Sequence, residues 1–175
     1  VAVTVTAVAA VFGECRKLEV KEAPFPFSVT EWTPPARDFP ITDYGARPDG
    51  MPVTEAVEKA VAAAQAAGGG RVVVPAGEWL TGAFKLKSEV ALVVNEGAVL
   101  RFPDDPVVVF RKPLNQHGRP VMTQGGLIQA DGCTNVAIMG RGTLKADVAY
   151  WHREFMKDPK RGFPRPQFFR FGRCK

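Results

Sequence analysis

The chain has 175 residues, which is enough for one domain with a sizeable core. Its 46% hydrophobic and 23% charged residues exclude an intrinsically disordered chain and a mostly membrane-embedded one. The net charge of +5 is unevenly placed, because residues 1–110 hold 10 Lys and Arg against 14 Asp and Glu, whereas residues 111–175 hold 13 against 4. A basic half is typical of binding to an acidic partner (nucleic acid, an anionic surface or an acidic polysaccharide), and equally of a solvated surface.

The first 13 residues, VAVTVTAVAAVFG, carry no charge. They are too few to span a bilayer and match the apolar part of a secretory signal, which predicts a signal-peptide remnant and a secreted or periplasmic protein. The alternation from Val1 to Val8 leaves an edge strand open as the alternative. Residues 14–38 are predicted to be a proline-rich strap, because the prolines in EAPFPFSVTEWTPPARDFP deny this stretch a regular helix.

A helix is predicted over residues 55–67. Thr54 is a good N-cap, apolar residues recur at helical spacing, and Gly68 provides a C-terminal stop. The apolar face consists mostly of alanine and valine, including Val57 and Val61, so it suits close packing against a flat surface. We therefore expect this helix to cap the end of a sheet structure.

Short strands are predicted beyond Gly70. Residues 71–80, 90–100 and 136–144 each contain an apolar strand, a turn with glycine and a second apolar strand, and LIQADGCT (127–134) aligns without a gap on FFRFGRCK (168–175). Repeats of strands that bury little alone predict a solenoid, here a parallel β-helix whose first coil starts at Val72 to Val74. A β-sandwich is the alternative, although it seldom begins with a single alanine-rich helix.

The stretch FPITDYGARPDG, followed by TEAVEKAVAAAQAAGGGRVVVPAGEWLTGAFKLKSEVALVVNEGAVLRF, resembles the start of glycoside hydrolase family 28, the polygalacturonases. It also resembles the pectate-lyase-like domain shared with rhamnogalacturonases and epimerase-like relatives. The resemblance covers residues 39–102 closely and 127–175 in pieces. It implies an all-β fold over residues 39–175, a right-handed single-stranded parallel β-helix (pectin-lyase-like) with an N-terminal helical cap. It also implies an acidic plant cell-wall polysaccharide as substrate: pectin, galacturonan or rhamnogalacturonan.

The chain departs from the family pattern in two places. Where the family has a Gly-x-Gly turn and two tryptophans, this chain has KADVAYWHREF with Trp151 alone, and residues 111–126 look unlike the usual segment. Both stretches are expected to be loops that border the substrate groove. Because loops at these places border the substrate groove in the family, the two departures imply an altered substrate specificity.

Inverting glycosidases need one carboxylic acid to protonate the leaving oxygen and an opposing carboxylate to activate water. In the family these groups belong to Asn-Thr-Asp and Asp-Asp motifs, helped by Gly-His-Gly and Arg-x-Lys. Asp104-Asp105 is a carboxylate pair, but its flanking prolines favour an ordinary acidic loop, and His117-Gly118 lacks the preceding glycine. No residue is therefore assigned as catalytic. Without these carboxylates the chain is expected to be inactive alone. It is also expected to be the N-terminal part of a longer enzyme, because a β-helix that stops at Lys175 leaves backbone groups unpaired.

Two other functions stay open, a non-catalytic β-helix that binds glycans (adhesin-like or tailspike-like) and a polysaccharide lyase of the same fold. No metal or cofactor is expected, because the cysteines (Cys15, Cys133 and Cys174) are too few and too scattered for a disulfide framework, and His117 and His152 match no zinc pattern. Neither nucleic acid binding nor a membrane span is expected. Binding of an anionic polymer would place these basic residues on one side of the fold: Arg111, Lys112, Arg119, Lys157, Lys160 and Arg161.

Overall fold

The computed structural model describes residues 3–5, 18–20, 32–105, 108–109, 126–157 and 166–175. The chain divides into two units, Val1–Thr33 and Pro34–Lys175. In the first unit, β1 (Val3–Val5) pairs antiparallel with β2 (Leu18–Val20). The signal-peptide remnant and the proline-rich strap stay predictions, because most of the first 31 residues lie outside this description.

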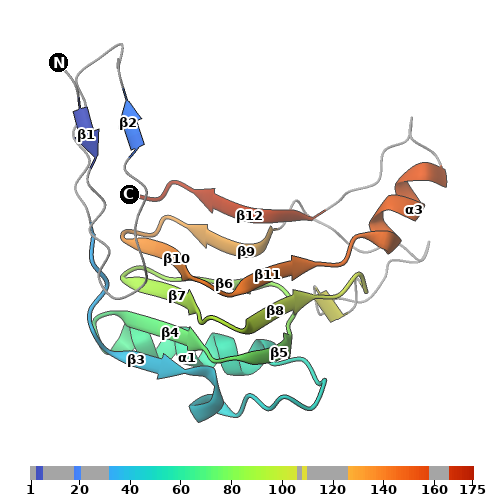
Figure 1. Cartoon of the computed structure of the whole chain (residues 1–175), viewed down its shortest axis with the longest axis horizontal. Helices are drawn as coiled ribbons and strands as arrows, with labels where there is room; N and C mark the ends of the chain where they lie inside the picture. Colours follow the sequence, from blue (N-terminus) through green and yellow to red (C-terminus); the bar gives the residue numbers. More distant parts are fainter. Residues whose placement is uncertain (1–2, 6–17, 21–31, 106–107, 110–125, 158–165) are drawn as a thin grey trace. The chain divides into compact units, whose positions relative to one another are not determined.

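Within the described residues, the second unit is built from three parallel sheets (Figure 1). The first sheet holds, in spatial order, β3 (Asp38–Pro40), β4 (Gly70–Val74), β7 (Val90–Val94) and β10 (Val136–Gly140). The second sheet holds β5 (Gly77–Leu80), β8 (Ala98–Phe102) and β11 (Thr143–Ala146). The third sheet holds β6 (Phe84–Lys85), β9 (Gly126–Asp131) and β12 (Gln167–Gly172).

The chain visits the three sheets in turn, so each circuit is one coil. Coil 1 runs β4–β5–β6, coil 2 runs β7–β8–β9, and coil 3 runs β10–β11–β12. Every strand pairs in parallel with the strand one coil away, as Figure 1 shows in the stacked rungs. The fold is therefore the right-handed parallel β-helix that the sequence predicts.

The sequence repeats correspond to the rungs. Val72 pairs with Leu92, which pairs with Ile138, and these three residues come from the three aligned segments. The gap-free alignment of 127–134 on 168–175 is also confirmed, because Phe169 faces Ile128. Strands that bury little alone thus share one continuous core.

That core is filled by large apolar side chains from all three sheets. Val72, Leu92 and Leu100 are fully buried, and the rings of Phe84 and Phe102 stack with centroids 6.1 Å apart. Burial of such a side chain stabilises the folded state by about 1.5–3 kcal/mol each. The stack of Phe84 on β6 of the third sheet with Phe102 on β8 of the second sheet therefore joins coil 1 to coil 2.

The helix α1 (Thr54–Ala66) closes the first end of this core. Its Val57, Val61 and Ala64 side chains are buried in the same apolar cluster as Val72 and Val74. Figure 1 shows it beside the lowest rungs, and it is the longest helix in the described part of residues 41–145. The end-cap prediction is confirmed.

The end of α1 follows the predicted chemistry and its start does not. Gly68 has φ +84°, the N–H of Gly68 donates to the carbonyl of Gln65, and the N–H of Gly69 donates to that of Ala64. This is a Schellman end. The predicted N-cap is wrong, because Thr54 lies inside the helix and Val53 is the N-cap residue. The Thr54 hydroxyl instead bonds to coil 1.

Coil 1 starts at β4, which contains the predicted Val72 to Val74. The sequence analysis did not predict the additional rung formed by β3, which pairs in parallel with β4 on its outer side. The pairing is fixed by an ion pair of 2.6 Å between Arg71 and Asp38 and by Phe39, which packs against the core. Pro40 is tolerated because β3 is an edge strand.

Another helix, α3 (Ala149–Lys157), occupies a stretch that the sequence analysis treats as loop. Trp151 is buried there, and the N–H of Tyr150 in the first turn donates a 2.9 Å hydrogen bond to Asp104. The acceptor comes from a residue far away in the sequence, so local pattern could not reveal it. Within the described residues, no helix is both long and apolar enough to cross a membrane.

Candidate functional site

The outer face of the third sheet carries a row of polar side chains. Lys85 on β6 faces Gln129 on β9, and Gln129 faces Arg170 on β12. Neighbouring parallel strands lie about 4.7–4.9 Å apart, so the row holds one side chain from each coil at about this spacing. The alternate positions point inward, where Phe84 and Ile128 are buried.

This row lines a hollow of about 660 Å³. The hollow extends to Lys87 beyond β6 and to Asp131 at the end of β9. Lys85, Lys87 and Arg170 bring three positive charges to it, and among the described residues that line it Asp131 is the only carboxylate. The hollow is therefore a cationic groove, and we call it the third-sheet groove.

Asp131 is held as an anion. Arg173 donates two hydrogen bonds to its carboxylate, of 2.6 and 3.0 Å. The hydrogen bond from Arg173 is the largest effect and lowers the pKa of Asp131 below its ordinary value. Desolvation, the next largest, raises this pKa, and the charges of Arg173, Arg170 and Lys85 each lower it. An acid that donates a proton near neutral pH needs a raised pKa, so Asp131 is unsuited to that role.

The turns beyond the groove are fixed to one another. The side-chain amide of Asn135 donates to Glu89 at 2.9 Å, and the N–H of Thr134 donates to the hydroxyl of Ser88 at 3.1 Å. Both bonds join the turn after β9 to the turn after β6. The groove therefore has a rigid rim at this end.

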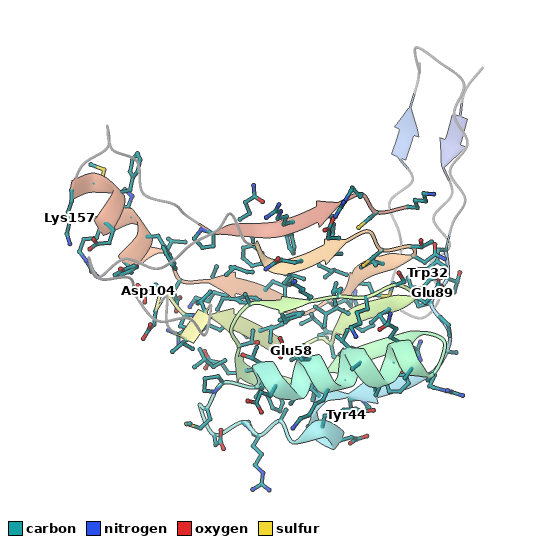
Figure 2. The ribbon with its side chains drawn as sticks, turned by 180° about the vertical axis from the view of Figure 1, so that it is seen from behind. Trp32, Tyr44, Glu58, Glu89, Asp104 and Lys157 are labelled. Carbon is teal, nitrogen blue, oxygen red and sulfur yellow. The ribbon has the colours of Figure 1, made fainter. Side chains whose placement is uncertain are left out.

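The carboxylate pair Asp104-Asp105, which the sequence analysis interprets as an ordinary acidic loop, lies elsewhere. Figure 2 shows Asp104 beside α3 and Glu89 at the opposite end of the rungs. Asp104 accepts the N–H of Tyr150, and Asp105 accepts the N–H of Val108 at 3.4 Å. Neither is among the described residues that line the third-sheet groove.

Most of the basic residues singled out from the sequence lie outside the described residues, as do His117 and Cys15. Lys157 is described; it is exposed on α3 and pairs with Glu154 one turn earlier. His152 is exposed on the same helix. The one-sided cluster predicted from that set stays a prediction.

Sequence reasoning missed the groove residues themselves. Gln129 and Arg170 occupy the same position in the aligned segments 127–134 and 168–175, so the alignment contained the signal. Alternation along β9 places Gln129 outward, between buried Ile128 and Ala130. Lys85 could not be aligned, because β6 spans two residues only.

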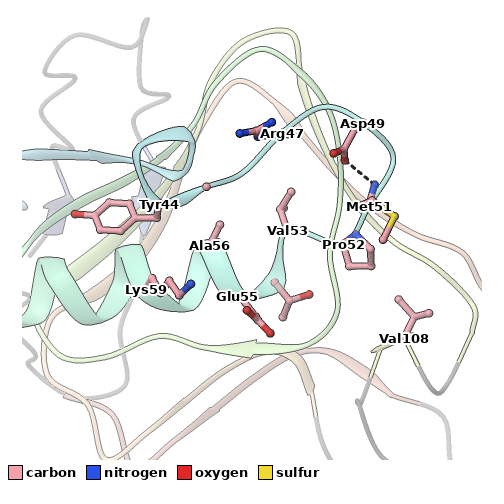
Figure 3. Close-up of a pocket in the computed structure, with 12 residues that line it drawn as sticks. Tyr44, Arg47, Asp49, Met51, Pro52, Val53, Glu55, Ala56, Lys59 and Val108 are labelled. Carbon is pink, nitrogen blue, oxygen red and sulfur yellow. Dashed lines mark hydrogen bonds between the residues drawn. The ribbon is translucent and has the colours of Figure 1, made fainter.

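Two other hollows are less suited to an extended ligand. One of about 430 Å³ surrounds the start of α1, where Arg47 and Lys59 are balanced by Asp49 and Glu55 (Figure 3). Asp49 is already bonded there to the N–H of Met51, at 2.9 Å. Another of about 360 Å³ lies against Trp151 and is mostly apolar. Only the third-sheet groove combines repeated spacing with excess positive charge among these three.

No family model matches the chain. A curated protein of Vitis vinifera, named "Probable polygalacturonase", is 34% identical over 156 residues, which are 82% of this chain and 30% of that protein. The crystal structure of a hyperthermoactive exopolygalacturonase from Thermotoga maritima matches with a TM-score of 0.65 and 28% identity, over 83% of this chain and 41% of that one.

The chain has the polygalacturonase-like, pectin-lyase-like fold.

A family 28 exopolygalacturonase of Yersinia enterocolitica supports the same assignment, with a TM-score of 0.51 and 27% identity over 62% of this chain and 20% of that one. This polygalacturonase-like chain spans less than half the length of each of these three relatives. The resemblance therefore covers most of this chain but only part of each relative.

Proposed function

We propose that the chain forms the helix-capped coils of a pectin-degrading glycoside hydrolase, and that the third-sheet groove binds the carboxylates of a galacturonan. The observation that carries the proposal is the row Lys85–Gln129–Arg170, which runs along the coil axis with one side chain from each coil. A polymer with one carboxylate per sugar needs cations at intervals along a groove. Secretion, which the N-terminal apolar stretch predicts, belongs to the same proposal.

The side chains in the row suit this ligand chemically. Arginine and lysine donate charge-assisted hydrogen bonds to carboxylates, and arginine does so with two parallel donors. The side-chain N–H of Gln129 donates to the carbonyl of Gly126 at 2.8 Å. We infer that its side-chain oxygen accepts a hydrogen bond from the ligand. An acceptor between two cations fits a sugar hydroxyl between two carboxylates.

The described groups of the groove support binding rather than bond cleavage. Inverting hydrolysis requires two carboxyl groups about 6.5–9.5 Å apart, one of them protonated. Asp131 is a single carboxylate with a lowered pKa. The absence of hydrolysis by the 175-residue chain alone therefore stays our expectation.

The binding proposal is tested by titrating the chain with a galacturonate oligosaccharide in a calorimeter. We expect Lys85→Gln and Arg170→Gln each to weaken binding by roughly tenfold, since a hydrogen bond to a charged group contributes about 1.5–3 kcal/mol. Lys145→Gln is the matched control, because Lys145 is exposed on β11 of the second sheet. Affinity should also fall as salt is raised, since charge attraction is screened over about 8 Å at physiological strength.

Three results would contradict the proposal. These are equal binding of a neutral glucan, binding unchanged in molar salt, and equal losses from Lys145→Gln and Arg170→Gln. Catalysis is assayed separately, by release of reducing ends from polygalacturonate. Turnover that disappears in Asp104→Asn would show that this carboxylate is catalytic, against our expectation.

A further inference from the structure

Cys133 and Cys174 occupy the same place in successive coils. Each follows a residue in the left-handed conformation, Gly132 with φ +64° and Arg173 with φ +54°. The Cys133 sulfur lies 3.5 Å from the carbonyl oxygen of Asp131, and the Cys174 sulfur lies 3.4 Å from that of Gly172. The two thiols therefore occupy equivalent positions in turns of the same local geometry.

Backbone hydrogen bonds hold these two turns against each other. The N–H of Lys175 donates to the carbonyl of Cys133 at 2.9 Å, and the N–H of Asn135 donates to the carbonyl of Lys175 at 3.0 Å. In a parallel ladder these bonds pair Lys175 with Thr134, so Cys174 faces Cys133. Facing residues of neighbouring strands lie about 4.7–4.9 Å apart. That separation falls inside the range of about 4.4–6.8 Å between Cα atoms joined by a disulfide.

The two thiols differ in access. Cys133 is buried, with its sulfur also 3.7 Å from the carbonyl oxygen of Leu86, whereas Cys174 is exposed. Both are free thiols in this structure. In the 175-residue chain a small oxidant therefore reaches Cys174 first, and Cys133 is the neighbouring thiol that can attack the resulting mixed disulfide.

We propose that Cys133 and Cys174 are an oxidisable pair, which a small disulfide such as oxidised glutathione converts into a disulfide between coils 2 and 3. The Cys174 thiolate attacks one sulfur of the oxidant, forms a mixed disulfide and releases one glutathione thiolate. The Cys133 thiolate then attacks the Cys174 sulfur, forms the protein disulfide and releases the second glutathione. The two protein thiols lose two protons and two electrons, and the disulfide bond of the oxidant takes up both electrons.

The disulfide would join the last two rungs of the third sheet at the rim of the third-sheet groove, which Cys133 lines. It would link β9 to β12 across the whole of coil 3, including α3. Oxidation therefore fixes one end of the groove. This inference depends on the register of two turns and is independent of what the groove binds.

The test uses the full chain carrying Cys15→Ser, so that only these two thiols remain. After incubation with oxidised glutathione, we expect the intact mass to fall by two hydrogen atoms and a digest to contain one peptide pair joined through Cys133 and Cys174. Reduction with a dithiol should restore the original mass. The protein should elute as a monomer throughout, because the bond is within one chain.

Two further variants keep the result interpretable. Cys133→Ser should stop at the first step and carry one glutathione on Cys174, and Cys174→Ser should stay largely unmodified because the remaining thiol is buried. The exposed position of Cys174 makes the second variant a safe control for folding. Stable glutathione adducts on a chain with both cysteines, or crosslinks only between two copies through Cys174, would overturn the proposal.

Discussion

The hydroxyl oxygen of Thr54 in α1 accepts a hydrogen bond of 2.6 Å from the backbone N–H of Gly82 in coil 1. Both residues are buried, and the Thr81 hydroxyl lies 3.4 Å from the same oxygen. A side chain at position 82 would meet the carbonyl oxygen of Val108 at 2.6 Å, so only glycine fits. The helical cap is therefore joined to the coil by a specific polar bond as well as by apolar packing.

Thr54→Val should destabilise the protein. The replacement keeps the shape of the side chain but leaves the N–H of Gly82 buried without its acceptor, at a cost of about 1–3 kcal/mol. Thr54→Ser is the matched control, because it retains the hydroxyl and should lose less. Chemical denaturation measures both free energies of unfolding, and equal losses would show that the bond contributes nothing.

Val61→Asp should have a larger effect. Val61 is 1% exposed against the first coil, so an aspartate there would bury an unpaired charge at a cost of several kcal/mol. Ala62→Asp is the control, since Ala62 is the next residue of α1 and is exposed. Thermal unfolding compares the two, and a Val61→Asp protein as stable as Ala62→Asp would remove the argument for the end cap.

The sequence predicted the fold because its signals are periodic and repeated. Short apolar strands joined by turns with glycine recur in residues 71–80, 90–100 and 136–144, and the Gly68 stop marks the end of α1. The polar contacts were not predictable, because they join residues in different coils. The Thr54 side chain serves as an acceptor for Gly82 rather than as a helix cap, and Asp104 caps α3 from the preceding coil.

The groove was partly visible in the sequence for the same reason. The alignment of 127–134 on 168–175 places Gln129 with Arg170 and Cys133 with Cys174, but it does not show that these positions border a groove. Lys85 could be assigned to the groove only from the pairing of β6 with β9 in the third sheet. The cysteines are far apart along the chain, and only stacking of the coils brings two of them together.

Asp104→Ala should loosen α3. The Asp104 carboxylate bonds the N–H of Tyr150 in the first helical turn, where a negative charge is also favoured by the helix dipole. Loss of such a cap costs about 0.5–2 kcal/mol, so amides in the helix should exchange with solvent faster. Asp104→Asn keeps an acceptor without the charge, so its exchange rates should lie between those of the wild type and Asp104→Ala. Unchanged exchange in Asp104→Ala would show that the cap is unimportant.

Gly140→Ala should destabilise far more than Gly45→Ala, although both glycines have positive φ, +111° and +97°. A methyl group at Gly45 meets open space, so its cost is the left-handed backbone alone, about 1–2 kcal/mol. A methyl group at Gly140 would overlap the backbone carbonyl of Val94 on the neighbouring rung, which adds about 1–3 kcal/mol of overpacking. Denaturant midpoints of the two variants test this, and equal values would mean that the rungs can separate at little cost.

The pair of Asp131 and Arg173 should give a stability contribution that depends on pH. The folded-state pKa of Asp131 is lowered, chiefly by the hydrogen bond from Arg173, so folding favours the anion. The contribution is then fully present above the unfolded-state pKa, about 3.9, and is lost as the pH falls through the lower folded-state value. The thermal midpoint of the wild type should exceed that of Asp131→Asn above about pH 5, and the difference should vanish in stronger acid.

A double-mutant cycle separates this pair from the other charges around the groove. In the Arg173→Gln background, the Asp131→Asn change should give a smaller difference between high and low pH, because the largest cause of the lowered pKa is gone. A small residual difference is expected, since Arg170 and Lys85 also favour the anion. Both side chains are exposed, so the effect on the midpoint should be modest at physiological salt. The same pH dependence with and without Arg173 would assign the anion's stabilisation to the groove cations, and would make Asp131 a competitor for any carboxylate that binds there.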